Sequence, residues 1–115
     1  MEEKYYVSWH TLILVMLSNL MCQINEYEDS VLYCKQGIEE LKKQSLISYE
    51  HMFLYNMVWS MEQEIKQGNK TEKERETYKK LLVQAYYLSI AQKESIYSKR
   101  IKNLWEHYYS GEMIE

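Results

Sequence analysis

The feature that most restricts the fold of this sequence is its near-complete lack of residues that break helices. The 115 residues contain no proline and only three glycines, whereas sandwiches and barrels need many turn residues. Leucine, glutamate, lysine, glutamine and methionine, which favour helices, are abundant. We therefore expect an all-α protein. The length is close to the commonest domain size, so we expect one domain over residues 1–115.

Apolar residues recur at the spacing of a helical face in five segments. Asn25 with Glu28, and Thr71 with Glu74, have the spacing of capping boxes, which predicts that helices begin there. Because the connections are short, consecutive helices should lie antiparallel. The five expected helices span about residues 3–24, 26–43, 49–67, 72–91 and 96–110.

The first two expected helices contain a pattern of large and small residues that resembles the tetratricopeptide repeat (TPR). In that family the pattern is W-x2-L-G-x2-Y on one helix and A-x3-F on the next. The small residues let the two helices approach closely, and the large residues fill the space between them. The corresponding residues here are Leu14, Leu17, Ser18 and Met21, followed by Ser30, Cys34 and Gly37.

A second hairpin matches the pattern more loosely, at Leu54, Met57, Val58 and Met61 and then at Tyr78, Leu82 and Ala85. Met61 and Tyr78 lie 17 positions apart, whereas Met21 and Ser30 lie 9 apart. We expect the extra residues to lengthen each helix of this hairpin by about one turn. The resemblance implies a TPR-like α-solenoid of about five antiparallel helices, two hairpins plus a half repeat. A generic helical bundle is the alternative.

Further features are similar to the C-terminal repeat domain of PlcR- and Rgg-like regulators, which are bacterial helix-turn-helix (XRE-type) transcriptional regulators. These features are the long helices, Leu54-Tyr55-Asn56, Gly68-Asn69 in a turn, and KKLLVQAYYLS over residues 79–89. In that family the repeat domain binds a short signalling peptide in its concave groove and usually dimerises. The resemblance implies a cytoplasmic domain for ligand sensing and dimerisation, here without a DNA-binding domain of its own.

The concave surface of such a solenoid is lined by the first helix of each pair. Amide side chains there offer both a donor and an acceptor to an extended peptide, and aromatic side chains offer anchor pockets. We expect a short peptide or protein segment to contact Asn19, Gln23, Tyr55, Asn56, Trp59 and Gln63. The alternative for Asn19 and Asn56 is a local hydrogen bond, and for Trp59 it is packing between helices.

Both ends of the sequence indicate missing neighbours, because helical repeats usually need three or more units to share a core. The first expected helix is apolar on nearly every side, and the last half-unit bears Trp105, Tyr108 and Tyr109. We expect these three residues to lie in an interface with a second copy, as in a homodimer, or with neighbouring repeats. The alternative function is a scaffold or oligomerisation module that senses no ligand.

Several other functions are not expected. A net charge of −3 argues against direct nucleic-acid binding. Polar residues interrupt Val7–Ile24 too often for a membrane span. His51 and Glu50 are the nearest candidate catalytic pair, but helix neighbours point about 100° apart, so we expect no enzyme. Cys22 and Cys34 are expected as small core residues, and we expect neither a metal nor a cofactor.

Overall fold

The structure is a computed structural model that describes residues 9–43 and 49–109. In this part of the chain the fold is all-α, as the sequence predicts, and it contains no strand. The helices are α1 (Trp9–Gln23), α2 (Tyr27–Lys43), α3 (Glu50–Lys66), α4 (Arg75–Ala91) and α5 (Ser95–Tyr108). A short 3-10 helix, η2 (Glu72–Glu74), lies directly before α4.

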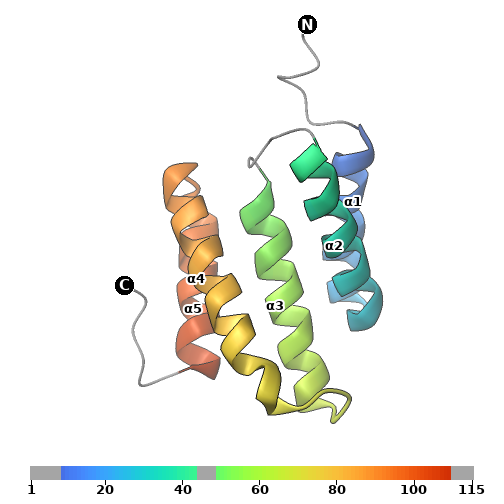
Figure 1. The fold of residues 1–115 in the computed structure, drawn as a ribbon, viewed down its shortest axis with the longest axis vertical. Coiled ribbons are helices and arrows are strands. Elements are labelled where there is room, and N and C mark those ends of the chain that lie inside the picture. Colours follow the sequence, from blue (N-terminus) through green and yellow to red (C-terminus); the bar gives the residue numbers. More distant parts are fainter. Residues whose placement is uncertain (1–8, 44–48, 110–115) are drawn as a thin grey trace, which may run out of the picture.

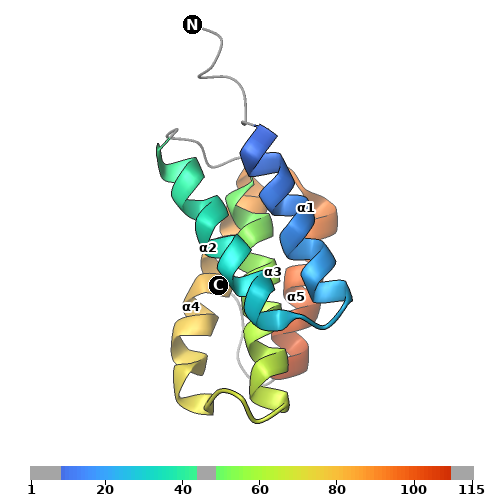
Figure 2. The same ribbon diagram turned by 90° about the vertical axis from the view of Figure 1, so that its right-hand side faces the viewer.

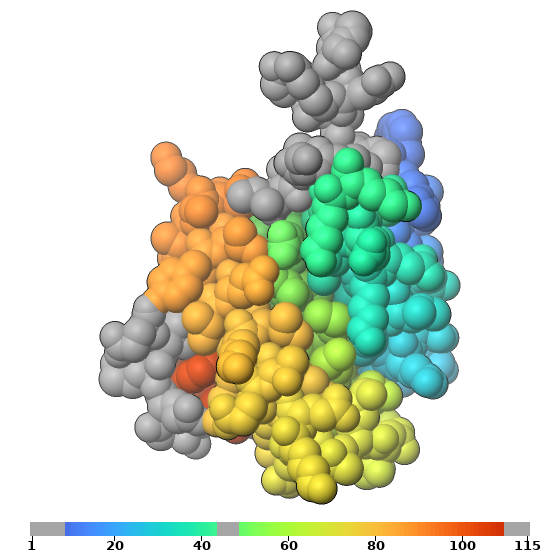
Figure 3. Space-filling model, in the orientation of Figure 1, coloured from blue at the N-terminus to red at the C-terminus, as the bar shows by residue number. Residues whose placement is uncertain are grey.

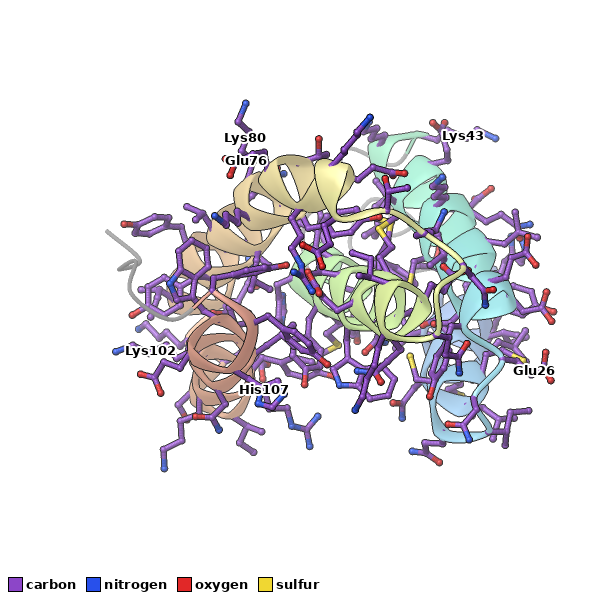
Figure 4. The ribbon with its side chains drawn as sticks, turned by 90° about the horizontal axis from the view of Figure 1, so that it is seen from below. Glu26, Lys43, Glu76, Lys80, Lys102 and His107 are labelled. Atoms are coloured by element: carbon purple, nitrogen blue, oxygen red, sulfur yellow. The ribbon has the colours of Figure 1, made fainter. Side chains whose placement is uncertain are left out.

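The helices are arranged in two layers. α1 and α2 form one antiparallel hairpin, α3 and α4 form the next, and α5 packs against α4 (Figure 1). α3 also contacts both α1 and α5, so these three helices share one side of the molecule, and α2 and α4 lie on the other (Figures 2 and 4). In the space-filling view, side chains of α2 and α4 make up most of the face of the molecule on which these two helices lie, and α3 is visible between them (Figure 3). The chain is therefore a helical-repeat fold of two hairpins and a half unit.

Within the described residues the helix bounds lie close to those expected. The expected start of the first helix at residue 3 and the expected end of the last helix at residue 110 lie outside the described residues. The clearest difference is in the second hairpin. α3 ends five residues after Met61, whereas α1 ends two residues after the corresponding Met21. α4 begins at Arg75, three residues before Tyr78, just as α2 begins three residues before the corresponding Ser30. α4 therefore has no extra turn at its N-terminal end. The expectation that both helices gain a turn is thus wrong for α4. Most of the extra residues form the connection over 67–74, which includes η2.

Three of the helices end in the same way, with one residue in the left-handed region. These residues are Asn25, Gly68 and Lys93, with φ of 66°, 84° and 58°. The amide of the following residue then reaches back into the helix, as when Glu26 N donates to Met21 O at 2.8 Å. Asn25 is therefore not the predicted N-cap of α2. Instead it closes α1, and its Oδ1 accepts a hydrogen bond of 2.7 Å from Tyr27.

The second predicted capping box is also wrong in its chemistry. Thr71 does occupy the N-cap position of η2, with extended backbone, but its side chain makes no capping hydrogen bond. Glu74 instead accepts a hydrogen bond of 3.2 Å from the Tyr78 hydroxyl, one turn further into α4. The spacing therefore located the start of the element but not the interaction that stabilises it.

The small residues of the repeat pattern lie where two helices meet, as the sequence predicts. Ser18 and Ser30 are fully buried, and Ser30 Oγ donates to the Ser18 carbonyl oxygen at 2.9 Å. Gly37 of α2 lies directly against the ring of Phe53 in α3, so closely that a Cβ atom at Gly37 would overlap the ring. The hairpins therefore meet through positions at which a larger side chain would force them apart.

A buried ion pair joins α3, α4 and the end of α5. Glu62 is fully buried, and its carboxylate accepts hydrogen bonds from Arg75 Nε at 3.0 Å and Arg75 Nη2 at 2.8 Å. The Tyr109 hydroxyl donates to the other carboxylate oxygen, Glu62 Oε2, at 2.6 Å. These bonds offset the cost of burying the charge and fix the half unit on the second hairpin.

Candidate functional site

Two neighbouring hollows lie on the side of the molecule formed by α1, α3 and α5. One has a volume of about 430 Å³ and the other about 400 Å³. Both are lined by Tyr55, Trp59 and Arg100, so they form one trough that crosses the three helices. The first hollow is lined also by Asn19, Cys22, Gln23, Asn25 and Asn56, and the second also by Gln63, Lys66, Asn103, Leu104, His107 and Tyr108.

All six residues predicted to contact a peptide line this trough. Asn19 and Gln23 come from α1 and are exposed at its edge. Tyr55, Asn56 and Trp59 lie in the middle, on α3, and Gln63 lies one turn further along the same helix. The structure therefore brings together side chains that are up to 44 positions apart in the sequence, counted from 19 to 63.

Asn56 is the deepest of the six and also has a local role. Its side chain is only 5% exposed, and its Nδ2 donates to Ser18 Oγ at 3.2 Å. The alternative of a local hydrogen bond is thus observed for this residue. Beneath it, Cys22 Sγ lies 3.0 Å from Ser30 Oγ and 3.1 Å from Ser60 Oγ. This cluster of small polar groups gives the trough a firm floor in which α1, α2 and α3 are bonded together.

Cys22 and Cys34 are both free and buried, as the sequence predicts for core residues. Burial raises the pKa of Cys34 to about 12, so its thiol stays protonated at neutral pH. Cys22 differs in position, because it reaches the floor of the trough while Cys34 is closed off behind it.

Two aromatic side chains of α3, Tyr55 and Trp59, line the middle of the trough. Trp59 packs edge-to-face on Tyr27, with ring centroids 5.5 Å apart, so the alternative of packing between helices is also observed. Tyr55 packs edge-to-face on Tyr97 at 5.9 Å, and the Arg100 guanidinium lies 5.1 Å from the Tyr97 ring centroid. Both Tyr55 and Trp59 remain partly exposed, so each ring is held from behind and presents a face to the trough.

α5 contributes residues that the sequence analysis did not identify. Arg100, Asn103 and His107 follow one another at i, i+3 and i+7, and all three are exposed and line the trough. Figure 4 shows His107 on the side of α5 toward α3, with Lys102 on the opposite side. The rule that locates the concave faces of α1 and α3 also applies to α5, so these residues were accessible to the same argument.

The trough has a distinctive charge. Arg100 and Lys66 are among its lining residues, and none of the described residues that line either hollow is an aspartate or a glutamate. This is unexpected in a chain with a net charge of −3. Acidic residues are therefore concentrated on other surfaces, and the local field in the trough favours an anionic group.

The structure corrects the expectation of an exposed interface at the end of the chain. Trp105 and Tyr109 are only 6% and 3% exposed, because both pack into the chain's own core. Tyr108 is partly buried, and its hydroxyl accepts a hydrogen bond of 2.7 Å from Gln63 Nε2 in the trough. Aromatic composition alone could not distinguish core packing from an interface.

The nearest candidate catalytic pair is not brought together. His51 is fully buried, and neither of its ring nitrogens has a hydrogen-bond partner. Glu50 faces α4, where its carboxylate accepts a hydrogen bond of 3.0 Å from Gln84 Nε2. His51 instead packs edge-to-face on Tyr97 of α5, with ring centroids 5.3 Å apart.

This buried histidine predicts a loss of stability in mild acid. Burial lowers the pKa of His51, and the charge of Glu94 only partly opposes this. Below its ordinary pKa of about 6.5, the unfolded chain binds a proton that the folded chain does not. The free energy of unfolding should therefore keep its full value above this pH and fall below it. His51 can account for at most about 1.4 kcal/mol of this fall per pH unit.

Urea unfolding between pH 7 and pH 5 tests this prediction. His51→Phe keeps an aromatic ring against Tyr97 and should make the pH dependence in this window shallower. An unchanged slope in His51→Phe would show that another group is responsible.

Among the described residues, no helix is long and apolar enough to cross a membrane, and no three His, Cys, Asp or Glu side chains are placed to hold a metal ion. The chain has no match among models of protein families, among curated proteins or among solved structures.

Proposed function

We propose that the chain is a peptide-binding helical-repeat module, the ligand-sensing part of a bacterial transcriptional regulator that acts in the cytoplasm. The observation that carries this proposal is the open trough across α1, α3 and α5, lined by amides, aromatic rings and cations. The link to a regulator rests on the similarity to PlcR- and Rgg-like sensor domains and on the helical-repeat fold, which supports it.

The chemistry of the trough suits an extended peptide. Asn19 and Gln23 at its edge each offer a donor and an acceptor to a peptide backbone. Tyr55 and Trp59 offer apolar faces on which a side chain of the peptide can pack. Helices in contact lie about 8–10 Å apart, so three helices span about 20 Å, which is the length of about six extended residues.

The charge of the trough predicts which peptides bind best. Arg100 lies at the junction of the two hollows, where it would meet an acidic side chain or a terminal carboxylate. We therefore expect acidic peptides to bind more tightly than basic peptides of the same length, and we expect the difference to shrink at high salt.

A thermal-shift screen tests the proposal with pools of short acidic, neutral and basic peptides. A ligand that binds only the folded chain raises its melting temperature, and the acidic pool should do so most. Arg100→Glu should weaken binding of the best peptide roughly tenfold, or about 1.4 kcal/mol. Lys102→Glu makes the same charge change on α5 outside the trough and should leave specific binding almost unchanged.

Two results would count against the proposal. The first is the absence of a shift with any pool, and the second is equal weakening by Arg100→Glu and Lys102→Glu. Asn56→Ala is a poor control because it also removes the hydrogen bond to Ser18 and would destabilise the floor.

A further inference from the structure

The outer face of α1 exposes a continuous apolar stripe. Its members are Trp9, Ile13, Met16 and Leu20 of α1 and Ile24 directly after it, which are 81%, 47%, 69%, 47% and 52% exposed. Positions separated by three or four residues lie on one side of a helix, so these side chains form a single row. The other exposed large apolar side chains among the described residues, Leu32, Tyr87, Ile90 and Ile96, are spread over α2, α4 and α5.

This stripe is unusually free of charge and unusually large. α1 contains no aspartate, glutamate, lysine or arginine between Trp9 and Gln23. At about 200 Å² for a large side chain when fully exposed, the stripe presents roughly 600 Å² of surface. A patch of this size is at the upper limit for a monomer and indicates an interaction site.

We infer that the stripe is the interface of a symmetric dimer, in which α1 packs antiparallel against α1 of a second copy of this chain. A two-fold interface must be complementary to itself, and the spacing of this stripe satisfies that condition. With the axis between Met16 and Leu17, Trp9 faces Ile24 of the partner subunit, and Ile13 faces Leu20 of the partner subunit. The stripe is therefore matched end to end when one copy is reversed.

The surface of α1 also has the shape that helix pairing needs. Ile13, Met16, Leu17 and Leu20 stand at i, i+3, i+4 and i+7, and together with Asn19 and Gln23 they line a hollow of about 420 Å³ on the helix surface. Four residues at this spacing form the hole that receives a side chain from a facing helix. The hole is centred on the proposed axis, so the two copies can fill each other's hollow.

Charge and area both favour a second copy of this chain as the partner. Because α1 has no formal charge, two copies of this face meet without repulsion between like charges. Two stripes together bury roughly 1,200 Å², the lower end of the range for a specific interface. The trough lies beside the stripe and shares an edge with it, because Asn19 and Gln23 line both the trough and the hollow on α1.

The mass of the chain in solution tests this inference. Light scattering should give about twice 14.1 kDa for the full chain at high concentration, with a fall toward the monomer on dilution. Met16→Glu places two like charges together at the axis and should give a folded monomer. Ile96→Glu changes a side chain of similar exposure on α5 and should remain dimeric. Circular dichroism of each variant checks that its helices are intact.

Cysteine cross-linking tests the orientation. A mixture of the Trp9→Cys and Ile24→Cys chains should form a mixed disulfide dimer on oxidation, whereas Trp9→Cys alone should not exceed the unsubstituted chain. Three results would overturn the inference. They are a monomer at every concentration, a dimer that survives Met16→Glu, and efficient cross-linking of Trp9→Cys alone. A monomer would mean that something other than a second copy of this chain covers the stripe.

Discussion

Replacement of Arg75 by alanine is expected to reduce the free energy of unfolding by about 3–5 kcal/mol, a large part of the total for a small domain. Glu62 is fully buried, and Arg75 supplies the positive charge that it faces. Removal of Arg75 leaves a buried carboxylate whose remaining described hydrogen bond comes from Tyr109. Urea unfolding followed by circular dichroism measures the loss.

A double variant distinguishes the cost of leaving the Glu62 carboxylate unpaired from the cost of losing the packing contacts of Arg75. Glu62→Leu together with Arg75→Leu removes both charges and keeps apolar volume, so it should recover most of the stability lost in Arg75→Ala. Tyr109→Phe should cost less, because Arg75 still pairs with the carboxylate. If Arg75→Ala costs under about 1 kcal/mol, the pair behaves as an exposed ion pair and the account of this junction is wrong.

Gly37→Ala is expected to cost about 1–3 kcal/mol, although alanine is the better helix former by about 1 kcal/mol. The added Cβ atom would overlap the fully buried ring of Phe53, so α2 and α3 must move apart. Combination with Phe53→Leu, which removes the ring, should relieve the clash. The double variant should therefore be more stable than the sum of the single losses predicts.

Gly68→Ala provides the matched comparison for this prediction. A Cβ atom at Gly68 would meet nothing within 4 Å, but the residue has a φ of 84°, which strains a side chain. Gly68→Ala should therefore lose less stability than Gly37→Ala, and this loss should be the same with or without Phe53→Leu. If the losses at Gly37 and Phe53 simply add, the close packing between the hairpins is not the cause.

The fold was largely predictable because helix packing follows patterns that repeat along the chain. Ser18, Ser30 and Gly37 had to be small for their helices to meet, and the structure confirms their contacts. The turns were less predictable because short polar residues serve equally well before and after a turn. Asn25 has the spacing of an N-cap, but its tolerance of a positive φ made it the end of α1 instead.

The trough was partly predictable for the same reason. Helical periodicity was sufficient to select Asn19, Gln23 and Trp59, because each faces away from the hairpin contacts. Periodicity could not show that Asn56 bonds to Ser18, or that Trp105 turns into the core, because those outcomes depend on the distances between helices. The pairing of Glu62 with Arg75 could not be predicted either. It depends on how the connection over 67–74 places the start of α4 against α3.

The most direct test of the proposed function is an NMR titration that follows the side-chain amide signals of the chain while an acidic short peptide is added. A peptide in the trough should shift the signals of Asn19, Gln23 and Asn103 together, because one extended ligand reaches all three. The signals of Gln36 and Gln84, which lie on α2 and α4, should not move. Shifts in the signals of Gln36 and Gln84, with no change at Asn19, Gln23 and Asn103, would contradict peptide binding in the trough.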